Sequence, residues 1–270
     1  MNLLSFLEYD FMRNALLAVC IITPLFGLMG TMVVENKMAF FSDALGHSAL
    51  TGIGIGVILG IGNVNLIMIV FAILFALLLN KIKQSRFVGT DTVISVFSSL
   101  SIALGLAILS QGGNFSRYSS VLVGDVLSIT AQEIVNLAVI FGAILIFWLF
   151  CFNMLHAISI NRSLAASYGV PVKWMENLFA AALAVIVMLS IRWVGILLIN
   201  ALLILPAAAA RNISANMREY HFFSVLFSLF SGILGLVVSF YCNMATGPAI
   251  VIVAAVIFFC TFFYSKSHGS

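Results

Sequence analysis

Long apolar runs follow one another along almost the whole chain, and they constrain the fold more than any other feature. A bilayer core about 30 Å thick is crossed by a helix of about 20 apolar residues. The pattern therefore predicts an all-α polytopic membrane protein. About nine transmembrane helices are expected, near residues 11–34, 40–60, 64–80, 88–110, 132–155, 176–191, 194–210, 220–240 and 246–264.

Only Arg192 and Trp193 separate the sixth run from the seventh, and each of these runs is near the short limit for a span. A count of eight spans is the alternative. Because 63% of the 270 residues are hydrophobic and 8% are charged, little sequence remains for a soluble domain. Residues 1–270 are interpreted as a single transmembrane domain.

Charge and cysteine usage exclude several classes of function. The net charge of +3 is small and the basic residues are scattered, which argues against a nucleic-acid partner. The four cysteines lie in apolar stretches without C-x-x-C spacing, so neither a thiolate metal site nor a disulfide framework is expected.

The distribution of Lys and Arg predicts the orientation in the membrane, because basic residues near span ends are retained in the cytoplasm. With the N-terminus outside and the C-terminus inside, nine of the 12 basic residues face the cytoplasm. Arg13, Arg117 and Arg192 lie outside. At residues 130–133, "TAQE" has the form of a capping box that begins the fifth span.

A short helix is predicted between the fifth and sixth spans, within residues 161–174. Its helical pattern stops at Gly169, and Pro171 follows, as at the C-terminus of a helix. Two interpretations remain open: an amphipathic segment at the membrane interface, or a helix that docks a cytoplasmic partner.

The second run contains an acid and a histidine four positions apart, Asp43 and His47, in "FFSDALGHSAL". Residues at this spacing project to one side of a helix. Ser48, Gly52, Gly56 and Gly60 have the small-xxx-small spacing of a packing face on the other side.

A carboxylate inside a membrane requires a wet cavity, a partner or a ligand. In one interpretation Asp43 caps the start of the helix and His47 only hydrogen-bonds to it. In the other, carboxylate oxygen and imidazole nitrogen coordinate a divalent ion such as Mn, Fe or Zn. One chain supplies two ligands, whereas a symmetric dimer with this helix at its axis would supply four.

The stretch "MAFFSDALGHSALTGIGIG" resembles the signature of the membrane permeases of bacterial ABC importers for zinc, manganese and iron. Similar blocks follow in the order of that family over nearly the whole chain: "RFVGTDTVISVFSSLSIALGLAILS", "SSVLVGDVLSIT", "SLAASYGVPV" and "WVGILLINALLILPAAAARNIS". The family has an acid near the start of the fourth of these blocks, where this chain has Arg162 and Ser163.

This resemblance implies a type II ABC importer-like permease in the bacterial inner membrane. Asp43 and His47 match the metal-holding positions of the family's central pathway. Leu164, Ala165, Ala166 and Gly169 match its coupling helix, which docks on the ATPase. The implied cargo is a divalent Mn, Zn or Fe ion, with no permanently bound cofactor.

The sequence contains no G-x-x-x-x-G-K-[ST] loop, so ATP hydrolysis is expected on a separate subunit and this chain is not expected to be an enzyme. The implied partners are a second copy of the chain, a cytoplasmic ATP-binding subunit and an extracellular or periplasmic metal-binding protein.

Three alternatives are weighed against this function. A secondary transporter driven by an ion gradient commonly has inverted repeats, and no internal symmetry is found. An intramembrane hydrolase is disfavoured because H-E-x-x-H is absent. An ABC permease for an iron-siderophore or corrinoid has a wide cavity and would not need the Asp43 and His47 pair.

Several other polar residues are interpreted as structural. Asp125 is expected to cap a turn or helix. Arg192 and Trp193 are expected to anchor a span at headgroup depth. The lone histidines are interpreted as interfacial or solvated and are left out of the site: His156, His221 and His268.

Overall fold

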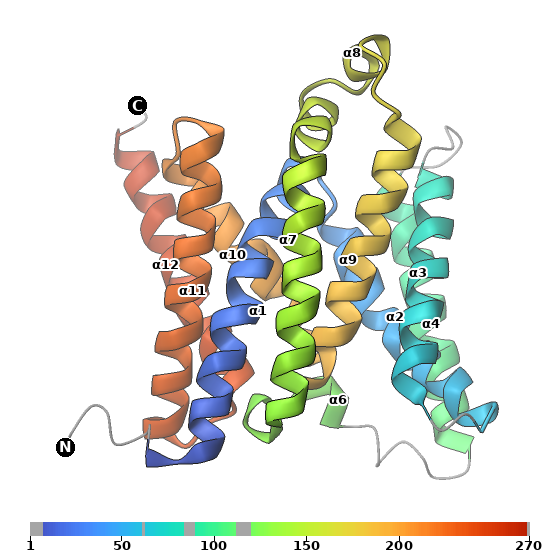
Figure 1. Cartoon of the computed structure of the whole chain (residues 1–270), viewed down its shortest axis with the longest axis vertical. Coiled ribbons are helices and arrows are strands. Elements are labelled where there is room, and N and C mark those ends of the chain that lie inside the picture. Colours follow the sequence, from blue (N-terminus) through green and yellow to red (C-terminus); the bar gives the residue numbers. More distant parts are fainter. Residues whose placement is uncertain (1–7, 61–62, 84–89, 112–119, 269–270) are drawn as a thin grey trace.

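The computed structural model describes residues 8–60, 63–83, 90–111 and 120–268, and the regular structure within these ranges is helical (Figure 1). This confirms the all-α prediction for the described residues. The long helices are α1 (Asp10–Glu35), α2 (Ala39–Ile58), α3 (Val64–Lys83), α4 (Thr90–Ser110), α7 (Ala131–Ile160), α9 (Val172–Val194), α10 (Ile196–Ile213), α11 (Met217–Cys242) and α12 (Thr246–His268). The short ones are α6 (Ser120–Val123), η3 (Val126–Ser128) and α8 (Arg162–Ser167).

Seven of the described helices are long and apolar enough to cross a membrane: α1, α3, α4, α7, α9, α11 and α12. The chain is therefore a multi-pass membrane protein. Helix α2 is not among the seven, since Asp43, His47 and its small residues lower its hydropathy. Helix α10 contributes only a shorter apolar stretch, Leu198–Ile213. The choice between nine and eight spans stays a prediction.

The break between α9 and α10 lies at Gly195, so the boundary expected at Arg192 and Trp193 is wrong. Both of those residues belong to the last turn of α9. Gly195 has φ +89° and ψ 149°, a conformation that is essentially restricted to glycine. Its backbone contacts Gly124, and a side chain at either glycine would collide with the other segment.

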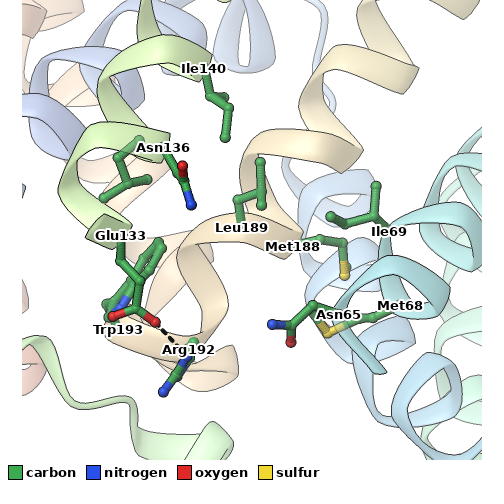
Figure 2. Close-up of a pocket in the computed structure, with 11 residues that line it drawn as sticks. Asn65, Met68, Ile69, Glu133, Asn136, Ile140, Met188, Leu189, Arg192 and Trp193 are labelled. Atoms are coloured by element: carbon green, nitrogen blue, oxygen red, sulfur yellow. Dashed lines mark hydrogen bonds and ion pairs between the residues drawn. The ribbon is translucent and has the colours of Figure 1, made fainter. Parts of the chain in front are cut away.

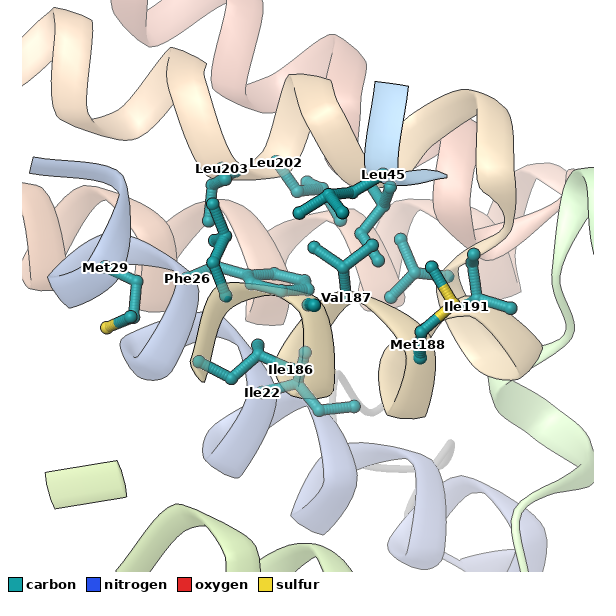
Figure 3. Close-up of a cluster of buried hydrophobic side chains, with 14 of the residues drawn as sticks. Ile22, Phe26, Met29, Leu45, Ile186, Val187, Met188, Ile191, Leu202 and Leu203 are labelled. Atoms are coloured by element: carbon teal, nitrogen blue, oxygen red, sulfur yellow. The ribbon is translucent and has the colours of Figure 1, made fainter. Parts of the chain in front are cut away.

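The two helices with the most buried apolar windows lie at the centre of the bundle. The windows of α1 and α9 are 67% and 61% buried, whereas the other five span candidates reach at most 39%. Figure 3 shows their contact, in which Phe26 of α1, Val187 of α9 and Leu203 of α10 meet with Leu45 of α2 nearby. Helices α3, α4, α7, α11 and α12 present large apolar side chains outward, as expected of a surface that faces lipid.

Hydroxyl groups join α1 to α11 within this apolar environment. Ser224 Oγ donates to the carbonyl oxygen of Gly27 at 2.6 Å, and Ser228 Oγ donates to that of Thr23. Such bonds, together with small residues that allow close approach, hold helices together in lipid. The capping box predicted for α7 is also confirmed, because Thr130 and Glu133 cap each other's backbone N–H groups.

Candidate functional site

Helix α2 is held among four neighbours, α3, α4, α9 and α10. Its glycines allow this close packing. A Cβ at Gly52 would lie 2.9 Å from Met68 Cα of α3, and one at Gly56 would lie 3.2 Å from Val64 Cγ1. The packing face predicted for α2 is therefore confirmed at Gly52 and Gly56. The prediction is wrong for Gly60, since α2 ends at Ile58 and nothing lies within 4 Å of a Cβ built at Gly60.

Asp43 and His47 lie on the one half-exposed strip of this part of α2. The distance from His47 Nε2 to Asp43 Oδ2 is 3.6 Å, and the two side chains are 22% and 44% exposed, respectively. The residues between and beside them are buried. The i, i+4 spacing therefore brings a carboxylate and an imidazole together on a partly exposed strip between buried residues of α2.

The interpretation of Asp43 as a helix cap is wrong. Helix α2 begins at Ala39 with Met38 at the N-cap position, and no side chain caps it. Asp43 lies one turn further along the helix. Its carboxylate is therefore not needed for an unsatisfied N–H group at the helix start.

The segment of α2 next to this pair is fixed against α10. Ser42 Oγ and Asn200 Oδ1 are 2.5 Å apart. Gly46, three residues after Asp43, also lies against α10. A Cβ built at Gly46 would be 3.4 Å from Ile199 Cγ2. These contacts fix the rotation of α2 about its axis and leave Asp43 and His47 partly exposed beside them.

The part of one chain that the structure describes does not supply a complete metal site from side chains of the usual kinds. Among the described residues, no group of three or more His, Cys, Asp or Glu side chains could hold a metal ion. Asp43 and His47 offer one hard oxygen donor and one imidazole donor, a combination that suits Mn, Fe and Zn. Further ligands would have to come from water or from another chain.

The second predicted site is α8, which lies at one end of the bundle above α7 and α9 (Figure 1). Asn161 caps the helix by accepting from the Leu164 N–H at 3.0 Å. At the other end, Gly169 has φ +82°, and the Val170 N–H donates to the Ala165 carbonyl at 3.1 Å. This is a Schellman ending, so the C-cap predicted at Gly169 is confirmed.

The predicted contact residues of α8 do not all face outward. Leu164 is 52% exposed, and Ala166 and Gly169 are exposed as well. Ala165 is buried against Ile158 of α7 and Val172 of α9. Any part that Ala165 has in docking is therefore indirect, through its contact with the two helices that carry α8.

Sequence reasoning missed two aromatic residues beside α8. Tyr168 and Trp174 are 81% and 76% exposed, and Trp174 lines a groove of about 520 Å³ that also includes Arg162 and Lys173. Exposed aromatic side chains are enriched at protein interfaces. Their position in the short stretch between two spans was the available signal.

The residues set aside as structural have defined surroundings. Asp125 caps η3 by accepting from the Leu127 N–H at 3.1 Å, as predicted. His156 and His221 lie against the Phe152 ring, with centroid distances of 5.9 and 5.2 Å, instead of in solvent. The side chain of His268, and Arg86 and Arg117, lie outside the described parts of the structure.

Known proteins resemble this chain over nearly its whole length. The sequence profile described as the ABC 3 transport family matches residues 8–265. The high-affinity zinc uptake system membrane protein ZnuB of Buchnera aphidicola is 28% identical over 244 residues, which cover 90% of this chain and 93% of that protein. The manganese transport system membrane protein MntC of Listeria monocytogenes is 26% identical over 263 residues, which cover 97% and 94%.

A solved structure has the same fold. PsaBC from Streptococcus pneumoniae in complex with Fab matches with a TM-score of 0.85 and 28% identity, over 95% of this chain and 94% of that chain. The resemblance drawn from the motifs is thus confirmed by whole-chain sequence similarity and by structural similarity.

Proposed function

We propose a function from one premise: the chain belongs to the ABC 3 transport family. The proposed function is that of the membrane permease in an ATP-driven importer of a divalent transition-metal ion. Relatives named for zinc and for manganese support this cargo class, and Fe shares the same ligand preferences. The ion is the cargo, and the proposal includes neither a resident cofactor nor an enzymatic step on this chain.

The contact between Asp43 and His47 carries the proposal. A carboxylate at the centre of a spanning helix costs about 2.5–3.5 kcal/mol on insertion scales, and Asp43, the fifth residue of α2 with a side chain that is 44% exposed, bears part of that cost. A passing dication would offset this cost by neutralising the carboxylate while the imidazole nitrogen completes a second bond. Because the Asp43 and His47 side chains are 44% and 22% exposed, an ion can reach the pair from outside the single chain.

The proposed assembly is a homodimer in which two copies of α2 face a common axis. Two Asp43 and two His47 side chains would then give four donors, the number that tetrahedral Zn sites use. Transport also requires such a site to release the ion, so its binding has to be weaker than that of a closed structural metal site.

The energy source and the partners follow from the same proposal. Since this sequence has no phosphate-binding loop, a cytoplasmic ATP-binding subunit would hydrolyse ATP and dock on α8. A metal-binding protein outside the membrane would deliver the ion to the opposite end. Residues 1–270 form one transmembrane unit in this scheme, with the N-terminus outside and the C-terminus inside the bacterial inner membrane.

Metal uptake by variants of the pair tests this function. We expect Asp43→Ala and His47→Ala each to reduce uptake of Mn or Zn by roughly 100-fold, because even an outer-shell partner of a metal ligand contributes 10–100-fold. Elemental analysis of the purified protein should show a parallel loss of bound metal. Asp10→Ala is the matched control, since Asp10 is a carboxylate in the first turn of α1 that is 94% exposed.

The control should transport like the wild type, and all variants should insert into the membrane in equal amounts. Uptake at the wild-type rate in either Ala variant of the pair would refute the proposal.

A further inference from the structure

Helix α10 contacts α2 along the stripe of residues next to Asp43 and His47. Ser42 and Gly46 precede these two residues by one position each, and both are buried against α10. Because successive residues of an α-helix are rotated by about 100° around its axis, the two pairs form neighbouring stripes on α2. The contact with α10 therefore determines the direction in which the stripe with Asp43 and His47 faces.

Asn200 of α10 supplies the polar part of this contact. Ser42 Oγ donates to Asn200 Oδ1 at 2.5 Å and also lies 2.8 Å from the Ala39 carbonyl oxygen, so its one proton is shared between two acceptors. Ser48, one and a half turns further along α2, donates only to the Leu45 carbonyl oxygen of its own helix, at 2.7 Å. The Ser42 hydroxyl thus joins two helices, whereas the Ser48 hydroxyl does not.

The other side-chain hydrogen bond from α2 to another helix, within the described part of the chain, lies further from the pair. Thr51 Oγ1 is 3.0 Å from Ser101 Oγ of α4. Thr51 is about two turns beyond Asp43, whereas Ser42 is its direct neighbour. The contact with Asn200 is therefore the polar anchor of the turn that carries Asp43.

The start of α10 is itself held in place, so Asn200 is presented to α2 from a fixed position. Asn200 lies five residues after the break at Gly195. Just before this break, Arg192 Nη1 of α9 donates to Glu133 Oε1 of α7 at 2.5 Å (Figure 2). Trp193 beside it is only 7% exposed, so the expectation that it is a surface anchor is wrong. These contacts tie the end of α9, and with it the start of α10, to α7.

On the basis of the proposed function, we propose that Asn200 is a positioning residue for the metal site. Its amide oxygen holds Ser42 and with it the rotation of α2, so that Asp43 and His47 of two copies converge on one ion. Loss of this contact leaves the spacing of the pair within one chain intact, because that spacing is set by a single helix. The direction of the pair relative to the second copy is then less well fixed, and metal affinity falls.

Zn²⁺ binding to the purified full-length chain in detergent, measured by isothermal titration calorimetry, tests this role. Asn200→Leu keeps a side chain of similar size and removes the acceptor. We expect it to weaken Zn²⁺ binding roughly fivefold to tenfold, the equivalent of one net hydrogen bond. Ser42→Ala removes the same contact from α2 with a residue that favours helix, and should have a similar effect. The double variant should bind no more weakly than Asn200→Leu alone, because the contact can be lost only once.

Asn212→Leu is the matched control. Asn212 lies further along the same helix, and its Nδ2 donates to a hydroxyl of a different neighbour, Thr261 Oγ1 of α12, at 3.2 Å. Asn212→Leu should bind Zn²⁺ like the wild type. Without metal, Asn200→Leu and Asn212→Leu should have similar melting temperatures, so that their difference in affinity does not reflect a difference in folding.

Wild-type Zn²⁺ affinity in Asn200→Leu and Ser42→Ala would overturn the positioning role. Equal weakening by Asn212→Leu would also overturn it, because the effect would then be one of general stability. Asp43→Ala in the same titration separates this result from a failure of the proposed function. If Asp43→Ala binds Zn²⁺ like the wild type, the metal site itself is refuted. If Asp43→Ala loses binding while Asn200→Leu and Ser42→Ala keep it, only the role of Asn200 is refuted.

Discussion

Helices α2 and α8 carry the two proposed functional sites, and they are held in place by different means. Helix α2 is packed among four other helices, and its glycines allow the contact. Helix α8 has six residues, most of them exposed, and is held by a cap at each end and an ion pair. The geometry of α2 thus depends on distant parts of the chain, whereas that of α8 depends mainly on local hydrogen bonds.

The largest effect expected from this difference is at the contact between α2 and α4. A Cβ at Gly105 of α4 would lie 2.6 Å from the Leu50 carbonyl carbon of α2. Gly105→Ala should therefore destabilise the protein by about 1–3 kcal/mol, the usual cost of overpacking. Thermal unfolding in detergent measures this loss.

Gly142 of α7 provides the matched control, because it is also a helical glycine but nothing lies within 4 Å of a Cβ built on it. Gly142→Ala should leave stability unchanged or raise it by up to about 1 kcal/mol through helix propensity. Equal thermal stability of Gly105→Ala and Gly142→Ala would show that α2 is not held by close packing.

A smaller and more local effect is expected at the end of α8. Gly169 has positive φ and open space around it, so Gly169→Ala changes the backbone preference without a clash. The cost should be about 1–2 kcal/mol. Hydrogen exchange should increase at residues 162–170, with little change in α2. Protection lost in both helices would contradict the local character of α8.

The smallest effect is expected from the ion pair of α8. Arg162 Nη2 lies 2.9 Å from Glu176 Oε2, and the Arg162 side chain is 49% exposed. Arg162→Gln should change stability by no more than about 1 kcal/mol, as for most exposed pairs. The measurable change should be in co-purification with the ATP-binding subunit. A loss of folded protein in this variant would mean that α8 depends on tertiary contacts as α2 does.

Features set by nearby residues could be predicted from the sequence. The apolar runs predicted the positions of the long helices because each span must satisfy its own backbone in lipid. The capping box at Thr130 and the ending at Gly169 depend on residues within one turn. The contact between Asp43 and His47 follows from their i, i+4 spacing on one helix.

Features that depend on residues distant in sequence could not be predicted in this way. The break at Gly195 coincides with its contact with Gly124, 71 residues earlier. The residues next to Trp193 in the sequence predict an interfacial anchor, yet Trp193 is buried and lines a cavity together with residues of α3 and α7.

The contact between Gly124 and Gly195 limits how the sequence can drift. Each glycine occupies the place where a side chain on the other would lie, and each also has positive φ. A side chain introduced at either position would collide with the backbone of the other segment. A second replacement at the partner glycine would not relieve this collision. Over many generations the two positions should stay glycine together, as one inherited unit, for as long as the chain keeps this shape.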